Sequence, residues 1–376
     1  MLLRKPHKRK IMTKNSVIDL IKNGIEEFPL TTAYKKDHRF YTDFVEMMDF
    51  FKSNLRKKEY QDIENKIKSG CLQPDEQAYL QCMSELIVLY FVMRQLNDNF
   101  KYEPKYNGGF NPECSFIYGG KTVNIEVKCP NMSKRMEIES HNTLKINFSE
   151  RAPDKSDYNN ITKDLKQIFS KSSENSEYSG IEAIPRMDNK LKDYLEHSQK
   201  KFPSGDNYFN ILVIALEICQ DVDEWYGYLL GDNGAFTPNS YIDTCYDRVD
   251  AVLLCTPICG LKRWNSYSNI NVWHLEETCN LLLLDPQKEC TKDRKQLTEK
   301  GKFYRDHGIS MFGNLTRLFF DFQRKLYAEN KKKYENLPFE YKYILFKEID
   351  TCIFSEFMEY LSSSEELQKM KQKLEI

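Results

Sequence analysis

The stretch YGGKTVNIEVKCP, residues 118–130, decides how the middle of this chain folds. Apolar and polar residues alternate over 121–129, and this period of two predicts a strand with one face on the core. The other face carries the polar side chains of Asn124, Glu126 and Lys128. The strand therefore places an acid and a base side by side.

The triplet Gly120-Lys121-Thr122 in this stretch matches the last positions of a phosphate-binding loop. Such a loop also needs a glycine five positions before Gly120 and a helix that begins after the loop. The chain has Ser115 at the first of these positions and a predicted strand at the second. Both requirements fail, which argues against an ATPase or a GTPase.

Periodicity on both sides of the stretch predicts an α/β fold. The pair Gly119-Gly120 indicates a tight hairpin between strands at 113–119 and 121–129, and 100–106 gives a third short strand signal. The apolar segment 74–98 predicts a long helix buried against the sheet. The other expected elements are helices within 16–70, at 188–202 and beyond about 291, and buried strands at 207–218, 248–258 and 280–285.

This pattern divides the chain into three expected regions. They are a basic arm with N-terminal helices over 1–73, a core over 74–290, and a C-terminal helical region over 291–376. The polar segment 131–180 predicts an insertion or mobile loop with one short helix near 160–169. The tract 313–334 mixes aromatic and basic residues. We expect it to pack in a core or a subunit interface, and a role in lining a nucleic-acid groove is the alternative.

Composition narrows the class of protein. With 40% hydrophobic and 13% aromatic residues, the chain of 376 residues is expected to fold. A net charge of −1 gives no overall attraction to nucleic acid, so such binding would depend on local basic patches. The patches are RKPHKRK at 4–10, RKK at 56–58, KDRK at 292–295 and KKK at 331–333, each more typical of a solvated helix face.

The cysteines and the apolar runs indicate in which cellular compartment the protein is expected. The 11 cysteines are scattered without a C-x-x-C pair and no secretory signal is evident, so we expect reduced thiols in a cytoplasmic protein. The longest apolar runs are too short to span a bilayer, so we expect no membrane association.

The pairing of Glu126 with Lys128 is distinguished by its surroundings. Acid-x-Lys triplets also occur at Glu64/Lys66, Asp188/Lys190, Asp293/Lys295 and Glu340/Lys342, where polar or helical surroundings indicate a solvated face. Only the Glu126/Lys128 pair lies on an apolar strand directly after a hairpin.

A second acid sharpens this prediction. Glu113 follows Pro112 at the start of the preceding strand, and the hairpin brings its carboxylate alongside that of Glu126. Two carboxylates supply the hard oxygen ligands that Mg²⁺ prefers. Lys128 could then orient or deprotonate an attacking water and stabilise negative charge on phosphorus.

The order helix, three-stranded meander, helix, strand, with Pro112-Glu113 and Glu126-Val127-Lys128, resembles the PD-(D/E)xK nuclease superfamily. The resemblance implies a restriction-endonuclease-like fold, a mixed sheet flanked by helices, here with helical N- and C-terminal extensions. It further implies that Glu113 and Glu126 are metal-binding acids, that the Val127 carbonyl is a metal ligand and that Lys128 is the catalytic lysine. Glu at 113 departs from the usual Asp of the family.

The flanking helices of the resemblance supply further candidates. Many members of the superfamily add an acid from the helix before the meander, and Glu85 is the only charged residue between Glu76 and Arg94. A buried unpaired glutamate is costly, so a metal partner would explain it; the alternative is that Glu85 lies at the helix surface or caps something. Some members use a Gln or Lys from the next helix, for which the candidates are Lys190, with Tyr194 one turn later, and Gln199.

The resemblance implies a Mg²⁺-dependent or Mn²⁺-dependent endonuclease that hydrolyses DNA, by analogy in restriction or anti-phage defence. Such nucleases often need two centres to cut both strands, so we expect a homodimer. Two alternatives stay open: cleavage of RNA or branched DNA by the same centre, and a non-catalytic nucleic-acid-binding or interaction protein that keeps the fold.

Overall fold

The computed structural model describes most of the chain between residues 16 and 312. The described ranges are 16–24, 28–70, 75–96, 99–106, 111–146, 160–161, 163–165, 167–168, 181–231, 233–238, 240–242, 246–266, 271–291 and 296–312. Predictions for the basic patches at 4–10, 292–295 and 331–333 and for the tract 313–334 lie outside these residues.

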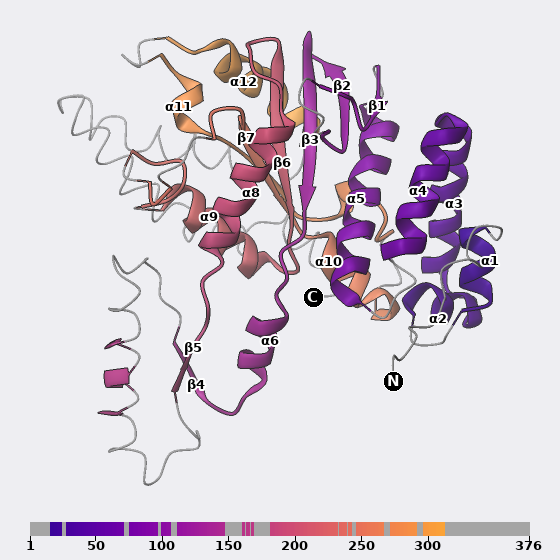
Figure 1. Ribbon diagram of the computed structural model, residues 1–376, viewed down its shortest axis with the longest axis horizontal. Helices are drawn as coiled ribbons and strands as arrows, with labels where there is room; N and C mark the ends of the chain where they lie inside the picture. Colours follow the sequence, from indigo (N-terminus) through magenta and orange to yellow (C-terminus); the bar gives the residue numbers. More distant parts are fainter. Residues whose placement is uncertain are drawn as a thin grey trace, which may run out of the picture.

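A mixed six-stranded sheet forms the centre of the molecule, in the order β1-β2-β3-β6-β7-β8 (Figure 1). Its strands are β1 (Lys101–Tyr102), β2 (Cys114–Tyr118), β3 (Lys121–Lys128), β6 (Tyr208–Ala215), β7 (Ala251–Cys255) and β8 (Asn280–Leu284). Strands β1, β2 and β3 form an antiparallel meander, β3, β6 and β7 run parallel, and β8 is antiparallel to β7. The predicted α/β class with a mixed sheet is confirmed.

The hairpin between β2 and β3 closes in two residues, as predicted. Tyr118 pairs with Lys121, and the intervening Gly119 and Gly120 have φ of +52° and +80°. Backbone with two successive positive φ values matches the right-handed twist of the strands and favours glycine. The chain then continues as β3, so no helix N-terminus follows Gly120, and the geometry of a phosphate-binding loop is absent from this stretch.

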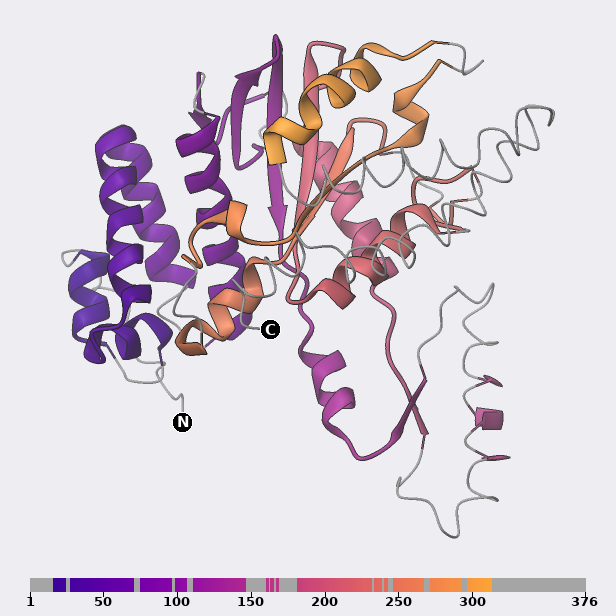
Figure 2. The same cartoon turned by 180° about the vertical axis from the view of Figure 1, so that it is seen from behind.

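The long helix α5 (Glu76–Gln95) lies between the sheet and the N-terminal helices (Figures 1 and 2). Asp75 caps it by accepting a hydrogen bond from the Ala78 amide. Because α5 is apolar around most of its circumference, it packs against β3 on one side and against α4 on the other. The N-terminal helices are α1 (Val17–Lys22), α2 (Pro29–Lys35), α3 (Arg39–Asn54) and α4 (Lys57–Gly70).

Alternate residues of the central strands face two separate cores. Ile211 and Leu253 belong to the larger core, which joins one face of the sheet to α5, the N-terminal helices and α12 (Glu299–Phe312). Leu212 and Leu254 belong to the smaller core, which is covered by α8 (Asp188–Lys201) and α9 (Cys219–Leu230). The other described helices are α10 (Pro257–Lys262), η1 (Trp264–Ser266), η2 (Leu275–Glu277) and α11 (Pro286–Glu289).

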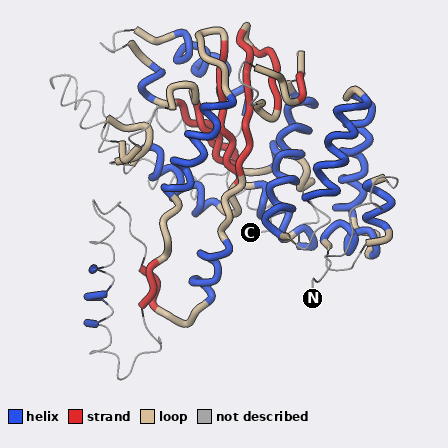
Figure 3. Tube along the Cα trace, in the orientation of Figure 1, coloured by secondary structure: helices blue, strands red, loops and turns tan. Residues whose placement is uncertain are grey.

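Two predicted segments differ from the structure. The strand expected over 100–106 is limited to β1, since Pro104 lacks the amide that a longer ladder would need. The polar segment expected to be a loop with one helix contains α6 (Ser133–Ser140) and β4 (Leu144–Ile146), which pairs in parallel with β5 (Ile181–Ala183) away from the main sheet (Figure 3). Its polar composition masks these elements, although described residues between 160 and 168 are helical as predicted. Within the described ranges, no helix is both long and apolar enough to cross a bilayer.

Candidate active site

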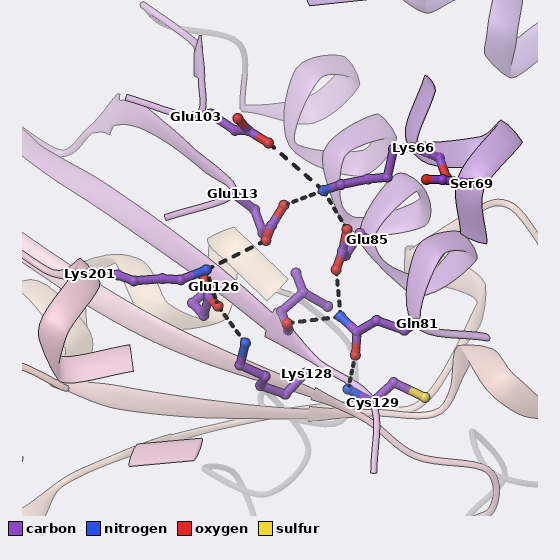
Figure 4. Close-up of polar contacts among 11 residues, drawn as sticks. Lys66, Ser69, Gln81, Glu85, Glu103, Glu113, Glu126, Lys128, Cys129 and Lys201 are labelled. Atoms are coloured by element: carbon purple, nitrogen blue, oxygen red, sulfur yellow. Dashed lines mark hydrogen bonds and ion pairs between the residues drawn. The ribbon is translucent and has the colours of Figure 1, made fainter. Parts of the chain in front are cut away.

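The structure brings the four predicted charged residues together at one place beside the meander (Figure 4). Glu126 and Lys128 project from β3, Glu113 immediately precedes β2, and Glu85 projects from the middle of α5. The pairing of β2 with β3 explains why Glu113 lies beside Glu126 and Lys128. The Glu113 amide donates a hydrogen bond to the carbonyl of Ile125, the residue before Glu126. These side chains come from three separate parts of the chain: α5, the residue before β2, and β3.

Glu126 is the most deeply buried acid of the group, with a side chain that is 0% exposed. Its Oε1 atom accepts a hydrogen bond from the Lys128 ammonium and forms an ion pair with the Lys201 ammonium, each at 2.7 Å. Its Oε2 atom is buried and has no hydrogen-bond partner among the described residues. A buried carboxylate oxygen without a partner is costly, which makes this atom a candidate ligand position.

Lys201, at the C-terminal end of α8, is a site residue that sequence reasoning missed. Its Nζ lies 2.7 Å from Glu126 Oε1 and 4.0 Å from Glu113 Oε1, so it links the two acids (Figure 4). The helix is the one expected at 188–202, but Lys201, and not the predicted Lys190 or Gln199, contacts the acids. One signal was available, a lysine near the end of a helix expected to face the site, yet so polar a helix offered several equivalent choices.

The residues predicted on that helix lie elsewhere. The side chain of Lys190 is exposed, Gln199 accepts a hydrogen bond from the Arg248 amide, and the Tyr194 hydroxyl donates to the Cys129 carbonyl at 3.4 Å. Neither of these two contacts is with Glu113 or Glu126.

Lys66, on α4, is the second missed residue, and it corrects a prediction. The triplet Glu64/Lys66 was expected to lie on a solvated face, yet Lys66 Nζ is 2.5 Å from Glu85 Oε2 and 2.8 Å from Glu113 Oε2. It also lies 3.9 Å from Glu103 Oε1. Burial disfavours its charge, but the carboxylates of Glu113 and Glu85 outweigh that effect and raise the pKa of Lys66 above its ordinary value.

Glu85 is buried, as the metal-ligand interpretation of the sequence expected, and it is paired. Besides its ion pair with Lys66, it accepts a hydrogen bond from Gln81 Nε2 at 2.6 Å. Burial raises the pKa of Glu85 and the nearby Glu113 carboxylate adds to the rise, while Lys66 opposes it. The alternative of a surface position for Glu85 is wrong.

Gln81 fastens α5 to the end of β3. Its Nε2 also donates to the Val127 carbonyl at 3.2 Å, and its Oε1 accepts from the Cys129 amide at 2.7 Å. The carbonyl predicted as a metal ligand therefore already accepts one hydrogen bond, which leaves its second lone pair for another partner. The two amide contacts hold Glu85, one turn along α5, in register with Glu126 on β3.

Asn124, also on the polar face of β3, holds this part of the strand by a different set of contacts. Its side chain accepts from the Tyr106 hydroxyl at 2.6 Å and donates to Asn210 Oδ1 at 2.8 Å.

Cys129, which follows Lys128, is a buried thiol. Burial raises its pKa to about 12, so the thiol stays protonated and is unsuited to act as a nucleophile.

We call Glu85, Glu113, Glu126, Lys66, Lys128 and Lys201 the acid–lysine cluster. Its three carboxylates and three ammonium groups compensate one another. Among the described residues, no three His, Cys, Asp or Glu side chains lie close enough to hold a metal ion as they stand. The donor set nonetheless suits a divalent cation, because carboxylate oxygens are the ligands of Mg²⁺ and Glu126 Oε2 is unpartnered.

A cavity of about 490 Å³ lies at the C-terminal ends of β3 and β6. None of the six cluster residues lines it. Its wall includes Gln77, Pro130, Glu217 and Lys262, the last two forming an ion pair at 2.8 Å. The geometry and charge of the acid–lysine cluster, and not the size of this cavity, identify the candidate site.

Comparison of the chain with protein-family models, curated proteins and solved structures finds no match.

Proposed function

We propose that this chain is a Mg²⁺-dependent endonuclease with a restriction-endonuclease-like core, in which the acid–lysine cluster hydrolyses phosphodiester bonds of DNA. The topology supports the proposal: α5 is followed by the β1-β2-β3 meander, then by α8, then by β6 in parallel with β3. That is the order on which the resemblance to the superfamily rests.

The observation that carries the proposal is the convergence of Glu85, Glu113 and Glu126 with Lys128. Glu113 and Glu126 are 13 positions apart in sequence and Glu85 is on a different element, yet single ammonium groups link them in pairs. Structural ion pairs need only one acid and one base, so three buried acids in one place are expensive to maintain without a function.

Each residue has a role that follows from its contacts. Glu126, through its unpartnered Oε2, together with Glu113 and Glu85, would hold Mg²⁺. When bound, the ion would lower the pKa of a coordinated water and offset charge on the phosphate. Lys128 and Lys201 share Glu126 Oε1, so either ammonium can turn from that oxygen to a water or a phosphate oxygen without leaving the site.

A second function, a non-catalytic protein that keeps this fold, is favoured by one observation. Each of the three carboxylates has at least one ammonium partner, as in a purely structural ion-pair network. Buried networks of this kind occur for structural reasons as well. The two proposals differ in whether the cluster binds a divalent cation and cuts nucleic acid.

The test is a cleavage assay on supercoiled plasmid, linear duplex and structured RNA, with Mg²⁺, Mn²⁺ or EDTA. Glu113→Ala and Lys128→Ala are compared with matched controls at exposed positions, Glu46→Ala and Lys190→Ala. We expect metal-dependent cutting by the wild type and both controls, and its loss in both cluster variants.

Cutting that survives both cluster substitutions would place the active site elsewhere. Absence of cutting on every polymer, with no metal binding, would favour the non-catalytic proposal. The RNA arm separates DNA cleavage from RNA cleavage by the same centre. Light scattering with and without duplex tests the proposed homodimer, and a role in restriction or anti-phage defence rests on analogy with the superfamily.

A further inference from the structure

The ammonium of Lys66 lies among three carboxylates at the edge of the site (Figure 4). It is 2.5 Å from Glu85, 2.8 Å from Glu113 and 3.9 Å from Glu103. The first two are the acids that would share a metal ion in the proposed function. Lys66 comes from α4, in the N-terminal helical region, outside the elements on which the superfamily resemblance rests.

Lys66 and a divalent cation would compete for the same oxygens. Mg²⁺ prefers carboxylate oxygens as ligands, so an ion held by Glu85 and Glu113 would need the oxygens that the Lys66 ammonium now contacts. The metal ion and the Lys66 ammonium, both positively charged and in contact with the same carboxylates, would repel each other strongly in a partly buried site. The ammonium must therefore move when the ion binds.

We propose that Lys66 is a displaceable counter-cation, which holds Glu85 and Glu113 together in the metal-free protein and is released when a divalent cation binds them. The inference rests on the proposed function, since it assumes that these acids bind metal. Lys66 is thereby a positioning residue that couples the N-terminal helices to the state of the site.

The contacts that anchor α4 do not involve the Lys66 side chain. Ile63 and Ile67 on α4 are 0% exposed in the larger core, and Glu64 accepts a hydrogen bond from the Val17 amide. These contacts lie away from the cluster and do not depend on the ammonium. A long lysine side chain can swing several ångströms without them changing.

Glu103 is the partner that the released ammonium would meet. Its side chain is 41% exposed and already within 4 Å of Lys66. Its backbone has a φ of +40°, in the left-handed region that non-glycine residues rarely adopt, and its amide donates to the Glu113 carbonyl at 3.0 Å. That hydrogen bond keeps Glu103 beside the site despite the strained conformation.

The first arm of the test measures Mn²⁺ affinity by electron paramagnetic resonance in the absence of nucleic acid. We expect Lys66→Gln to bind Mn²⁺ about tenfold or more tightly than the wild type, because the competing charge is gone. Lys66→Arg keeps the charge and should show no gain, and Lys58→Gln, at an exposed position of the same helix, is the matched control.

The second arm uses the wild-type chain and needs no substitution. Lysines are labelled with an acetylating reagent, with and without Mn²⁺, and quantified by mass spectrometry. We expect labelling of Lys66 to increase several-fold with Mn²⁺, while that of exposed Lys58 stays constant.

The outcomes separate this inference from the function on which it rests. Saturable Mn²⁺ binding with unchanged labelling of Lys66, and equal affinity in Lys66→Gln, would overturn the counter-cation and leave the metal site standing. No Mn²⁺ binding by the wild type or by Lys66→Gln would overturn both. Binding by Lys66→Gln that far exceeds binding by the wild type would support both.

Discussion

Replacing Glu126 by glutamine tests both the ion pairs and the unpartnered oxygen of the site. Glutamine has the same shape and keeps an acceptor for Lys128 and Lys201, but it carries no charge. The charge-assisted hydrogen bond from Lys128 is worth about 1.5–3 kcal/mol, against about 1 kcal/mol for a neutral one, and the ion pair with Lys201 lies at the same distance of 2.7 Å. The substitution therefore weakens these two contacts by roughly 2 kcal/mol in total.

Two further effects act in opposite directions and largely cancel. The amide NH₂ takes the place of Oε2, and a buried donor left without an acceptor there costs about 1–3 kcal/mol. Removing a fully buried carboxylate recovers part of its desolvation cost, which is several kcal/mol per ion. We expect Glu126→Gln to lower the free energy of unfolding by about 2 kcal/mol in EDTA.

Divalent metal should widen this difference. A ligand that binds only the folded state at a hundred times its Kd adds about 2.7 kcal/mol to the free energy of unfolding. The wild type should gain this stabilisation with Mn²⁺ and Glu126→Gln should gain very little, because its site lacks the Oε2 ligand.

The assay is urea unfolding followed by tryptophan fluorescence, which reports the buried rings of Trp225 and Trp273. Glu46→Gln, at an exposed position, is the matched control. The reasoning is refuted if Glu126→Gln is at least as stable as the wild type in EDTA and gains the same stability from Mn²⁺.

Three further experiments with substituted chains test other parts of the account. Gly119→Ala should lower the free energy of unfolding in urea by about 2 kcal/mol or more, because its φ is +52° and a Cβ would lie 2.4 Å from His307 Nε2. Gly120→Ala should lower it by only about 1–2 kcal/mol, because Gly120 has a φ of +80° but no neighbour within 4 Å of the added Cβ. An equal cost at the two glycines would contradict the proposed clash. Burial raises the pKa of Asp285 to about 6, so the folded protein binds that proton more tightly than the unfolded chain, and the stability that it contributes falls as the pH rises from about 4 to about 6. Asp285→Asn should remove about 2–3 kcal/mol of this pH dependence in urea titrations, and a slope that is unchanged would show that other groups cause it. Lys201→Met should slow metal-dependent cleavage at least about tenfold while Lys190→Met, from the exposed face of the same helix, leaves it unchanged; equal rates in the two variants would exclude Lys201 from the site.

The part of the site that could be predicted from the sequence is the part that local rules determine. A period of two and a Gly-Gly pair specify a hairpin, and the hairpin by itself places Glu113 beside Glu126 and Lys128. Glu85 could be predicted because it is the only charge on an otherwise apolar helix, and burying it alone would be costly.

Lys66 and Lys201 could not be predicted because only tertiary packing brings them to the site. Lys66 is 47 residues from Glu113 in sequence, and nothing on α4 distinguishes it from the other lysines of a polar helix. Lys201 is one of three lysines in the last ten residues of α8, Lys192, Lys200 and Lys201, and only the docking of that helix against β3 and β6 determines which of them reaches Glu126. The β4–β5 pair was missed for a related reason, since its short strands lie in a segment without a sustained apolar pattern.

Anomalous diffraction from crystals soaked in Mn²⁺ tests the central claim most directly, because it locates the metal without assuming any activity. We expect one strong peak within about 2.5 Å of Glu126 Oε2 that also contacts the Glu113 carboxylate. The absence of a peak at these carboxylates, with Lys66, Lys128 and Lys201 still in their ion pairs at saturating Mn²⁺, would contradict the account and identify the acid–lysine cluster as a structural network.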